Sequence, residues 1–312
     1  MTHQGLVGCV SRTAHRVVWL SFVLVSCLFS PPPTAHSTQH SKGLVGVLIL
    51  AHGGSEQWNR TVAATVEQAQ LAYPTEVAFG MGMHRQEVDR WQQAVDRLHA
   101  QGVGRIVVVP LLVSSASEVS RQVHYLFGLR DDGPWEAHVQ PLALPVPVFM
   151  ARALDDDPVV ADILLERALG LSRVPAEESV ILIAHGPNAD DDNAQWLEVM
   201  TRLGRWIQAQ GRFRAVVPVT MRDDASAAVQ GAATRQLREV VHHQSAQGRT
   251  IVVPLLIASG GIEAKIPQRL EGLQYVYDGA TLLPHPKVAQ WIARQVEAAL
   301  EADVPVARVG QL

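Results

Sequence analysis

Gly46-Val-Leu-Ile-Leu-Ala-His52-Gly53 recurs later in the chain as Val180-Ile-Leu-Ile-Ala-His185-Gly186. A second pair of related stretches follows, Ile106-Val-Val-Val-Pro110-Leu-Leu-Val113 and Ile251-Val-Val-Pro254-Leu-Leu-Ile257. In both halves the order is a buried strand, His-Gly, a helix, a second strand, a helix and the Pro-Leu-Leu strand. A repeat of this kind predicts an α/β protein with two similar domains, each a parallel sheet flanked by helices, and a cleft between them.

The two halves predict alternating strands and helices. The first domain is expected at residues 43–171 and the second at 178–303, with a short polar linker around Pro175. Continuous apolar runs with β-branched residues are typical of strands covered on both faces. Strands are expected at 45–50, 77–81, 106–113, 180–184, 214–219 and 250–257, helices at 55–71, 86–101, 118–126, 158–169, 191–210, 225–246 and 286–301, and an extended segment at 139–148. Such alternation implies parallel sheets with right-handed crossovers.

The composition bears on the class of partner and cofactor. The 312 residues carry a formal net charge of -4, which argues against a nucleic-acid partner. Neither half contains a GxGxxG fingerprint or a Walker A loop, so no organic cofactor is expected. The apolar content of 47% is enough for two ordinary domain cores.

The first 40 residues differ from the rest and are interpreted as a signal peptide or leader. Arg12 and Arg16 precede an apolar run at 17–29, which is typical of a signal peptide and too short to span a bilayer comfortably. Leu24-Val-Ser-Cys27 also resembles a bacterial lipobox. The protein is therefore expected to be exported to the periplasm, either after cleavage or as a lipoprotein anchored through Cys27, and a disordered leader is the alternative.

Three side chains are candidate metal ligands. His52 ends the first strand, His84 follows the second, and Glu118 follows the third at the start of a helix. Parallel strands present their carboxyl ends at one edge of the sheet, so these side chains are expected to converge. Two imidazoles and a carboxylate suit Co²⁺, Fe²⁺, Ni²⁺ or Zn²⁺. Cysteine ligands are not expected in the folded body, because both cysteines lie in the leader.

The residues around these ends of the strands are expected to bind the substrate. Gly53 lets a ligand approach the backbone closely. The other candidates follow strands in one half or the other. The full set is Gly53, Ser114, Ser115, His185, Arg222 and Glu263. Arg222 is expected to take the position in the second half that His84 takes in the first.

The repeated strand–Ala-His-Gly and Val-Val-Pro-Leu-Leu motifs resemble those of the class II tetrapyrrole chelatases. The resemblance is to the sirohydrochlorin cobaltochelatase and ferrochelatase family in its two-repeat form, and it covers most of residues 44–301. Leu283-Pro-His-Pro286, before the last helix, is similar to the segment that closes this family. Glu118, and Ile262 followed by Glu263 in the second half, stand where the family has a second histidine.

The resemblance implies insertion of Co²⁺ or Fe²⁺ into sirohydrochlorin or a related tetrapyrrole. His52 corresponds to the histidine that binds the incoming metal and helps to remove the pyrrole protons. Glu118 is then its carboxylate partner in catalysis, and His84 an accessory ligand. Arg85, Arg121 and Arg222 are alternative partners for the acidic side chains of the macrocycle.

Two other functions remain open at this point. An exported carrier of metal or tetrapyrrole without turnover would account for the missing second histidine of the family. A periplasmic binding protein for a small solute would account for two lobes and a leader, but not for the paired His-Gly ends of the strands. The oligomeric state is left open.

Overall fold

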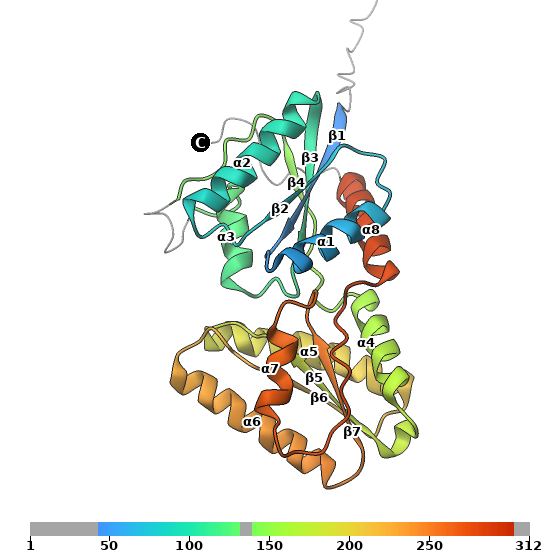
Figure 1. Ribbon diagram of the computed structural model, residues 1–312. Helices are drawn as coiled ribbons and strands as arrows, with labels where there is room; N and C mark the ends of the chain where they lie inside the picture. Colours follow the sequence, from blue (N-terminus) through green and yellow to red (C-terminus); the bar gives the residue numbers. More distant parts are fainter. Residues whose placement is uncertain (1–42, 132–138, 303–312) are drawn as a thin grey trace, which may run out of the picture. The chain divides into compact units, whose positions relative to one another are not determined.

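The computed structural model describes residues 43–131 and 139–302 (Figure 1). The leader at residues 1–40, with Cys9 and Cys27, lies outside the described residues, so the expected signal peptide and lipid anchor stay predictions. None of the helices in the described ranges is long and apolar enough to cross a membrane. The described residues all belong to one compact unit.

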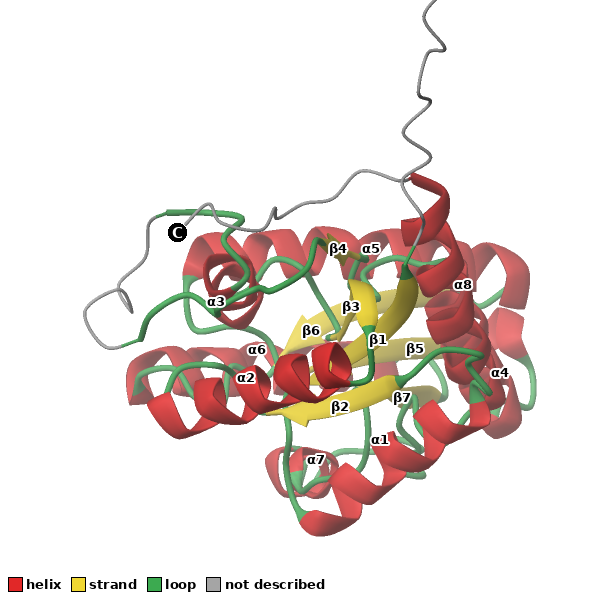
Figure 2. Cartoon of the chain, turned by 90° about the horizontal axis from the view of Figure 1, so that it is seen from above, coloured by secondary structure: helices red, strands yellow, loops and turns green. Residues whose placement is uncertain are grey.

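Two parallel sheets organise this unit. The first has the order β2-β1-β3-β4 and the second the order β6-β5-β7. The strands are β1 (Leu44–Ala51), β2 (Thr75–Phe79), β3 (Val103–Leu111), β4 (Val148–Met150), β5 (Ser179–Ala184), β6 (Ala215–Thr220) and β7 (Thr250–Leu255). The predicted α/β class with two parallel sheets flanked by helices is confirmed, and Figure 2 shows the strands enclosed between helices.

Helices and one short turn connect the strands. They are α1 (Glu56–Gln68), α2 (Arg85–Ala100), α3 (Glu118–Leu126), α4 (Pro158–Leu171), η1 (Pro175–Glu177), α5 (Asp190–Gly211), α6 (Ala227–Ser245), α7 (Ile262–Arg269) and α8 (Pro286–Ala302). Side-chain caps set several of the helix starts. Ser55 Oγ accepts a hydrogen bond from Trp58 N, and Ser117 Oγ accepts one from Ser120 N.

The prolines inside strands lie where a missing backbone N–H costs little. Pro218 and Pro254 belong to β6 and β7, which are the edge strands of the second sheet. Pro110 lies in the interior strand β3, but β4 pairs only with residues 106–108 of that strand. The Pro-Leu-Leu motif of both halves is thus compatible with a strand.

The register brings the ends of the strands to a common edge in each sheet. Ala51 of β1 pairs with Phe79 and Leu111, so His52 and the segments after β2 and β3 leave the first sheet together. Ala184 of β5 pairs in the same way with Thr220 and Leu255. The turns after β1 and β5, which carry the two His-Gly pairs, therefore occupy equivalent positions in the two sheets.

The long helices that end the two halves are exchanged between the sheets. Helix α4 packs against α5 and β7, whereas α8 packs against α1, β3 and β4 (Figure 1). The sequence repeat instead predicts that the helix at 158–169 packs with the first half, which it ends. By its contacts α4 therefore belongs with the second sheet and α8 with the first, although the sequence repeat places each helix in the other half.

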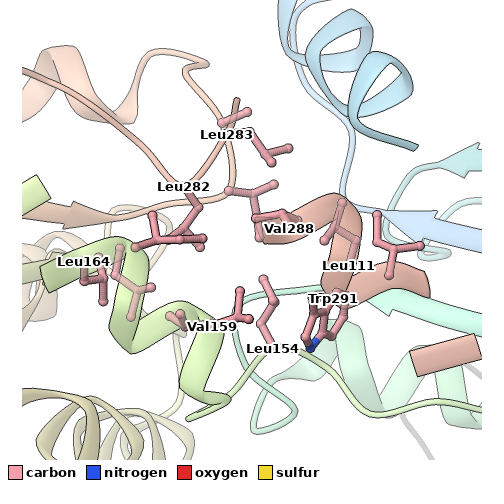
Figure 3. Close-up of a cluster of buried hydrophobic side chains, with 14 of the residues drawn as sticks. Leu111, Leu154, Val159, Leu164, Leu282, Leu283, Val288 and Trp291 are labelled. Atoms are coloured by element: carbon pink, nitrogen blue, oxygen red, sulfur yellow. The ribbon is translucent and has the colours of Figure 1, made fainter. Parts of the chain in front are cut away.

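One continuous hydrophobic cluster accompanies this exchange. It combines buried residues of β1 and β3 with those of β5, β7, α4 and α8. Figure 3 draws Leu154, Val159 and Leu164 of the α4 region together with Leu111 among the side chains of this cluster. The labelled residues from before and within α8 are Leu282, Leu283, Val288 and Trp291. The two sheets share a core through these helices.

Candidate functional site

His52 stands at the carboxyl end of β1 with its side chain exposed. Its Nδ1 donates a hydrogen bond to the carbonyl oxygen of Gly53 at 2.9 Å, because a carbonyl can only accept. Gly53 has φ of 81°, a conformation that favours glycine. This bond leaves Nε2 of His52 with its lone pair and with no hydrogen-bond partner in the described ranges.

A cavity of about 520 Å³ opens beside His52, and both halves line it. Its walls are formed by segments that follow β1, β2 and β3 in the first sheet and β5, β6 and β7 in the second. The polar and charged side chains of the lining are His52, Ser114, Ser117, Glu118, Arg121, His185, Asn188, Asp192 and Asp224. Trp58 and Trp196 are among its apolar side chains. Concave sites of this size and composition bind small molecules and cofactors.

His185 enters the same cavity from the end of β5. Its Nε2 lies 3.4 Å from Oδ2 of Asp224, in the turn after β6. Burial lowers the pKa of His185 below the usual 6.5. The charges of Asp224 and Asp223 act in the opposite direction, and the charge of His52 lowers the pKa further. His185 is therefore neutral at neutral pH.

Hydrogen bonds hold the turns that carry these groups. In the second sheet Met221 N donates to Ala184 O at 2.9 Å, and Arg222 N donates to His185 O at 2.6 Å. In the first sheet Gly80 N donates to Ala51 O at 3.0 Å. Gly80 therefore corresponds to Met221. Met83 and Asp224 each lie three residues further along the chain, so they are counterparts as well.

Glu118 begins helix α3 and lines the cavity. The turn before it is tied to the second half, because Trp196 Nε1 donates to Ala116 O at 2.6 Å. One turn further along α3, Arg121 donates to both carboxylate oxygens of Asp192, at 2.7 and 2.8 Å. The carboxylate of Glu118 is thus presented on a segment fixed from both sides.

The first half of the chain, which carries His52 and Glu118, is similar to a known protein family. Residues 46–170 match the family model CbiX. A sirohydrochlorin cobaltochelatase from Saccharolobus islandicus is 26% identical over 124 residues, which are 40% of this chain and 93% of that protein. One from Methanosarcina barkeri is 20% identical over 123 residues, or 39% and 93% of the two chains. Over residues 46–170 the chain is therefore similar to the CbiX-type class II chelatases.

Two solved structures extend the likeness in fold to both halves of the chain. SirB from Bacillus subtilis with Fe3+ has a TM-score of 0.62 at 17% identity, and the match covers 84% of this chain and 99% of that one. A multi-domain protein from Deinococcus radiodurans, described as structurally similar to chelatases, has a TM-score of 0.53 at 17% identity. That match covers 84% of this chain and 56% of the other.

The structure does not bring the three predicted metal ligands together. His52 and Glu118 line the cavity, but His84 does not, and its side chain is exposed at the start of α2. Across the described ranges, no three His, Cys, Asp or Glu side chains are close enough together to hold a metal ion. The loop after β2 bends at Gly82, which has φ of 70°, and ends at His84, the N-cap of α2. Met81 and Met83 in this loop line the cavity, whereas His84 lies outside its lining.

The residues predicted to bind substrate divide into two groups. Gly53, Ser114 and His185 line the cavity. Ser115 is outside the lining, and its backbone N and Oγ donate to Asp155 Oδ1 at 2.8 and 3.1 Å. Glu263 is also outside, where its Oε2 accepts from the backbone N of the two glycines that precede α7.

Arg222 likewise supports the cavity from outside its lining. Its guanidinium forms an ion pair with Asp190 at 2.7 Å and donates from Nε to Pro187 O at 3.1 Å. Because Met221 and Gly80 make equivalent backbone hydrogen bonds, the residue after each corresponds, so Arg222 is the counterpart of Met81. The expected correspondence of Arg222 with His84 is therefore wrong. Its contacts fix the turn after His185.

Asp224 is the polar residue that sequence reasoning missed. The Asp223-Asp224 pair after β6 was a usable signal, but sequence alone does not tell which of the two faces the cavity. Asp223 is turned away from solvent, where Lys265 Nζ lies 3.0 Å from its Oδ2 and Arg269 bonds its Oδ1. Asp224, with a side chain 70% exposed, is left to face His185.

The charges around the cavity favour a cation. Glu118, Asp192 and Asp224 are acidic, and among the described lining residues Arg121 is the one arginine or lysine. Because Arg121 is already paired with Asp192, Glu118 and Asp224 leave the cavity with a net negative potential.

Proposed function

We propose that this protein is a chelatase that inserts a divalent metal, Co²⁺ or Fe²⁺, into sirohydrochlorin or a closely related tetrapyrrole. The observation that carries the proposal is that His52, Glu118 and His185 line one cavity with apolar walls at the carboxyl ends of two parallel sheets. The match of residues 46–170 to the CbiX family model and the similarity to sirohydrochlorin cobaltochelatases support the same reaction. The metal is a substrate here and not a resident cofactor.

Metal insertion exchanges two protons for one metal ion. Two pyrrole N–H bonds break, their electron pairs remain on nitrogen and bind the metal, and no atom is oxidised or reduced. The protein has to strip water from the metal, hold the macrocycle and receive the protons. Each of these tasks needs groups that the cavity contains.

His52 is suited to receive the metal. Its Nδ1 is occupied by Gly53 O, so the lone pair of Nε2 is available as a ligand. The carboxylate of Glu118 offsets part of the positive charge, and imidazole with carboxylate suits both Co²⁺ and Fe²⁺. Ni²⁺ and Zn²⁺ accept the same ligands, so the rates of insertion of these two metals should be compared with those of Co²⁺ and Fe²⁺.

The apolar side chains are suited to hold a flat macrocycle. Trp58 and Trp196 line the cavity from the first and the second half, and both are less than 10% exposed. Aromatic faces bind flat π-systems through offset stacking. Their burial also excludes water, which strengthens the electrostatic interactions within the cavity.

The test is an absorbance assay with the purified protein, sirohydrochlorin, and Co²⁺ or Fe²⁺. We expect conversion to the metallated product over many turnovers, faster than with metal alone. His52→Ala should abolish it and leave the fold intact. His99→Ala is the matched control, because His99 is an exposed histidine in the last turn of α2. A spectral change that stops after one equivalent contradicts the proposal.

We also propose that the leader at residues 1–40 directs export to the periplasm, on the apolar run and the Leu24-Val-Ser-Cys27 motif. Cell fractionation tests this. If Cys27 is lipidated, Cys27→Ala moves the protein from the membrane to the soluble periplasmic fraction. If the leader is simply cleaved, the substitution leaves the distribution unchanged. Recovery of the unprocessed chain in the cytoplasm contradicts export.

A further inference from the structure

The two repeats of this chelatase carry unequal histidines. In the first, the turn after β2 places the thioether of Met83 at the cavity, and Nδ1 of His52 bonds only its neighbour's carbonyl oxygen. In the second, the equivalent position is Asp224, and its Oδ2 lies 3.4 Å from Nε2 of His185. Only the second repeat therefore pairs its imidazole with a carboxylate from this turn.

A carboxylate next to an imidazole prepares the ring to accept a proton. The charge of Asp224, 3.4 Å from Nε2, favours the tautomer with its hydrogen on Nε2 and its lone pair on Nδ1. The same charge stabilises the imidazolium and so opposes the effect of burial on the pKa of His185. In the described part of the chain, no hydrogen bond occupies Nδ1 of His185. Glu118 lines the same cavity as His52, but within the described residues no ion pair or hydrogen bond joins the two side chains, so the two rings are suited to different tasks.

The turn that carries Asp224 is rigid, which keeps this pair in place. Asp223 is held by Lys265 and Arg269 on its carboxylate, and its carbonyl oxygen accepts from Gln230 Nε2 at 2.8 Å. Arg222 N donates to His185 O and so ties the turn to the histidine itself. The pair is thus built before substrate binds.

We propose that His185, positioned by Asp224, accepts the pyrrole protons while His52 binds the incoming metal. The two histidines follow strands of different sheets and line the same cavity, so both are within reach of a macrocycle bound there. Each pyrrole N–H bond gives its proton to Nδ1 of His185 and its electron pair to the metal. Water then removes the proton, which frees Nδ1 for the second transfer. This inference rests on the proposed function.

The test separates metal binding from proton transfer. The full-length protein and its variants are titrated with Co²⁺ alone, and then assayed with Co²⁺ and sirohydrochlorin for kcat and KM. We expect His52→Ala to lose both Co²⁺ binding and turnover. For His185→Ala we expect unchanged Co²⁺ affinity and KM, and a kcat lower by about 100-fold, which is the usual range for loss of a general base. Added imidazole should restore part of that kcat.

Two further variants keep the result clear. Asp224→Asn, at an exposed side chain, should lower kcat by about 10-fold without changing Co²⁺ affinity, and His99→Ala should behave as wild type. If His185→Ala does not fold, a wild-type kcat in Asp224→Asn overturns the inference. So does a folded His185→Ala with wild-type kcat, or with the same loss of Co²⁺ affinity as His52→Ala. Absence of turnover in the wild type instead overturns the proposed function, and the inference with it.

Discussion

Arg121 of α3 and Asp192 of α5 form a two-pronged ion pair, with Nη1 to Oδ1 at 2.7 Å and Nη2 to Oδ2 at 2.8 Å. The Asp192 side chain is only 8% exposed, and the pair joins a helix of the first half to one of the second. Bidentate contacts of this kind restrict orientation as well as adding energy. The wall of the cavity that carries Glu118 is positioned by this contact.

Arg121→Ala is expected to destabilise the protein by about 1–3 kcal/mol, because it leaves the Asp192 carboxylate largely buried without its partner. Denaturant unfolding measures this change. Arg60→Ala is the matched control, since its ion pair with Glu56 is exposed to solvent and should contribute at most about 0.5 kcal/mol. Equal effects of the two substitutions would contradict a structural role for the Arg121 pair.

Leu164→Ala in α4 is expected to lower the free energy of unfolding by about 2–5 kcal/mol, because a fully buried side chain is removed from the shared core. Since that core spans both sheets, hydrogen exchange should show that β1 and β5 lose protection together. Leu169→Ala on the same helix is the control, because Leu169 is 44% exposed. Loss of protection confined to the second sheet would argue against one shared core.

Glu178 makes stability depend on acid pH. Burial raises the pKa of this carboxyl, but hydrogen bonds from Ser172 Oγ and Arg173 N, with the charge of Arg249, outweigh burial and leave the pKa below 4.5. A lowered pKa in the folded state contributes stability that is present above about pH 4.5 and is lost as the pH falls through the folded-state value. Glu178→Gln should lower stability at pH 7 and flatten its decline below pH 5. Thermal unfolding from pH 7 to pH 3 measures both, and a parallel decline in the two proteins would contradict the assignment.

Gly260→Ala is expected to impair the cavity itself. A Cβ at this position would lie 2.9 Å from Cδ1 of Trp58, so the indole has to shift within the lining. We expect kcat/KM for the tetrapyrrole to fall by about 10-fold, because small misplacements of binding groups are costly in catalysis. Gly231→Ala in α6 is the control, since its Cβ would meet only an arginine side chain at 3.6 Å. Unchanged kinetics in Gly260→Ala would show that Trp58 does not position the substrate.

Local sequence patterns predicted the secondary structure well. Helix α3 begins and ends at the expected residues, 118 and 126, and β5 differs from its expected range by one residue. Apolar runs and caps act over a few neighbouring residues, so they can be read directly from the chain. The pattern did not predict the short strand β4, which follows the expected extended segment at 139–148, and it missed the short helix α7.

The sequence by itself determined the repeated strand–His-Gly plan, the parallel sheets, and the presence of His52, Glu118 and His185 at the ends of strands. Only the tertiary structure decided that α4 and α8 exchange sheets, that His84 lies outside the cavity lining, and that Asp224 lies next to His185. The physical reason is the distance along the chain over which each kind of interaction acts. Periodicity and turn chemistry act between near neighbours, whereas these choices depend on packing between segments far apart in the chain.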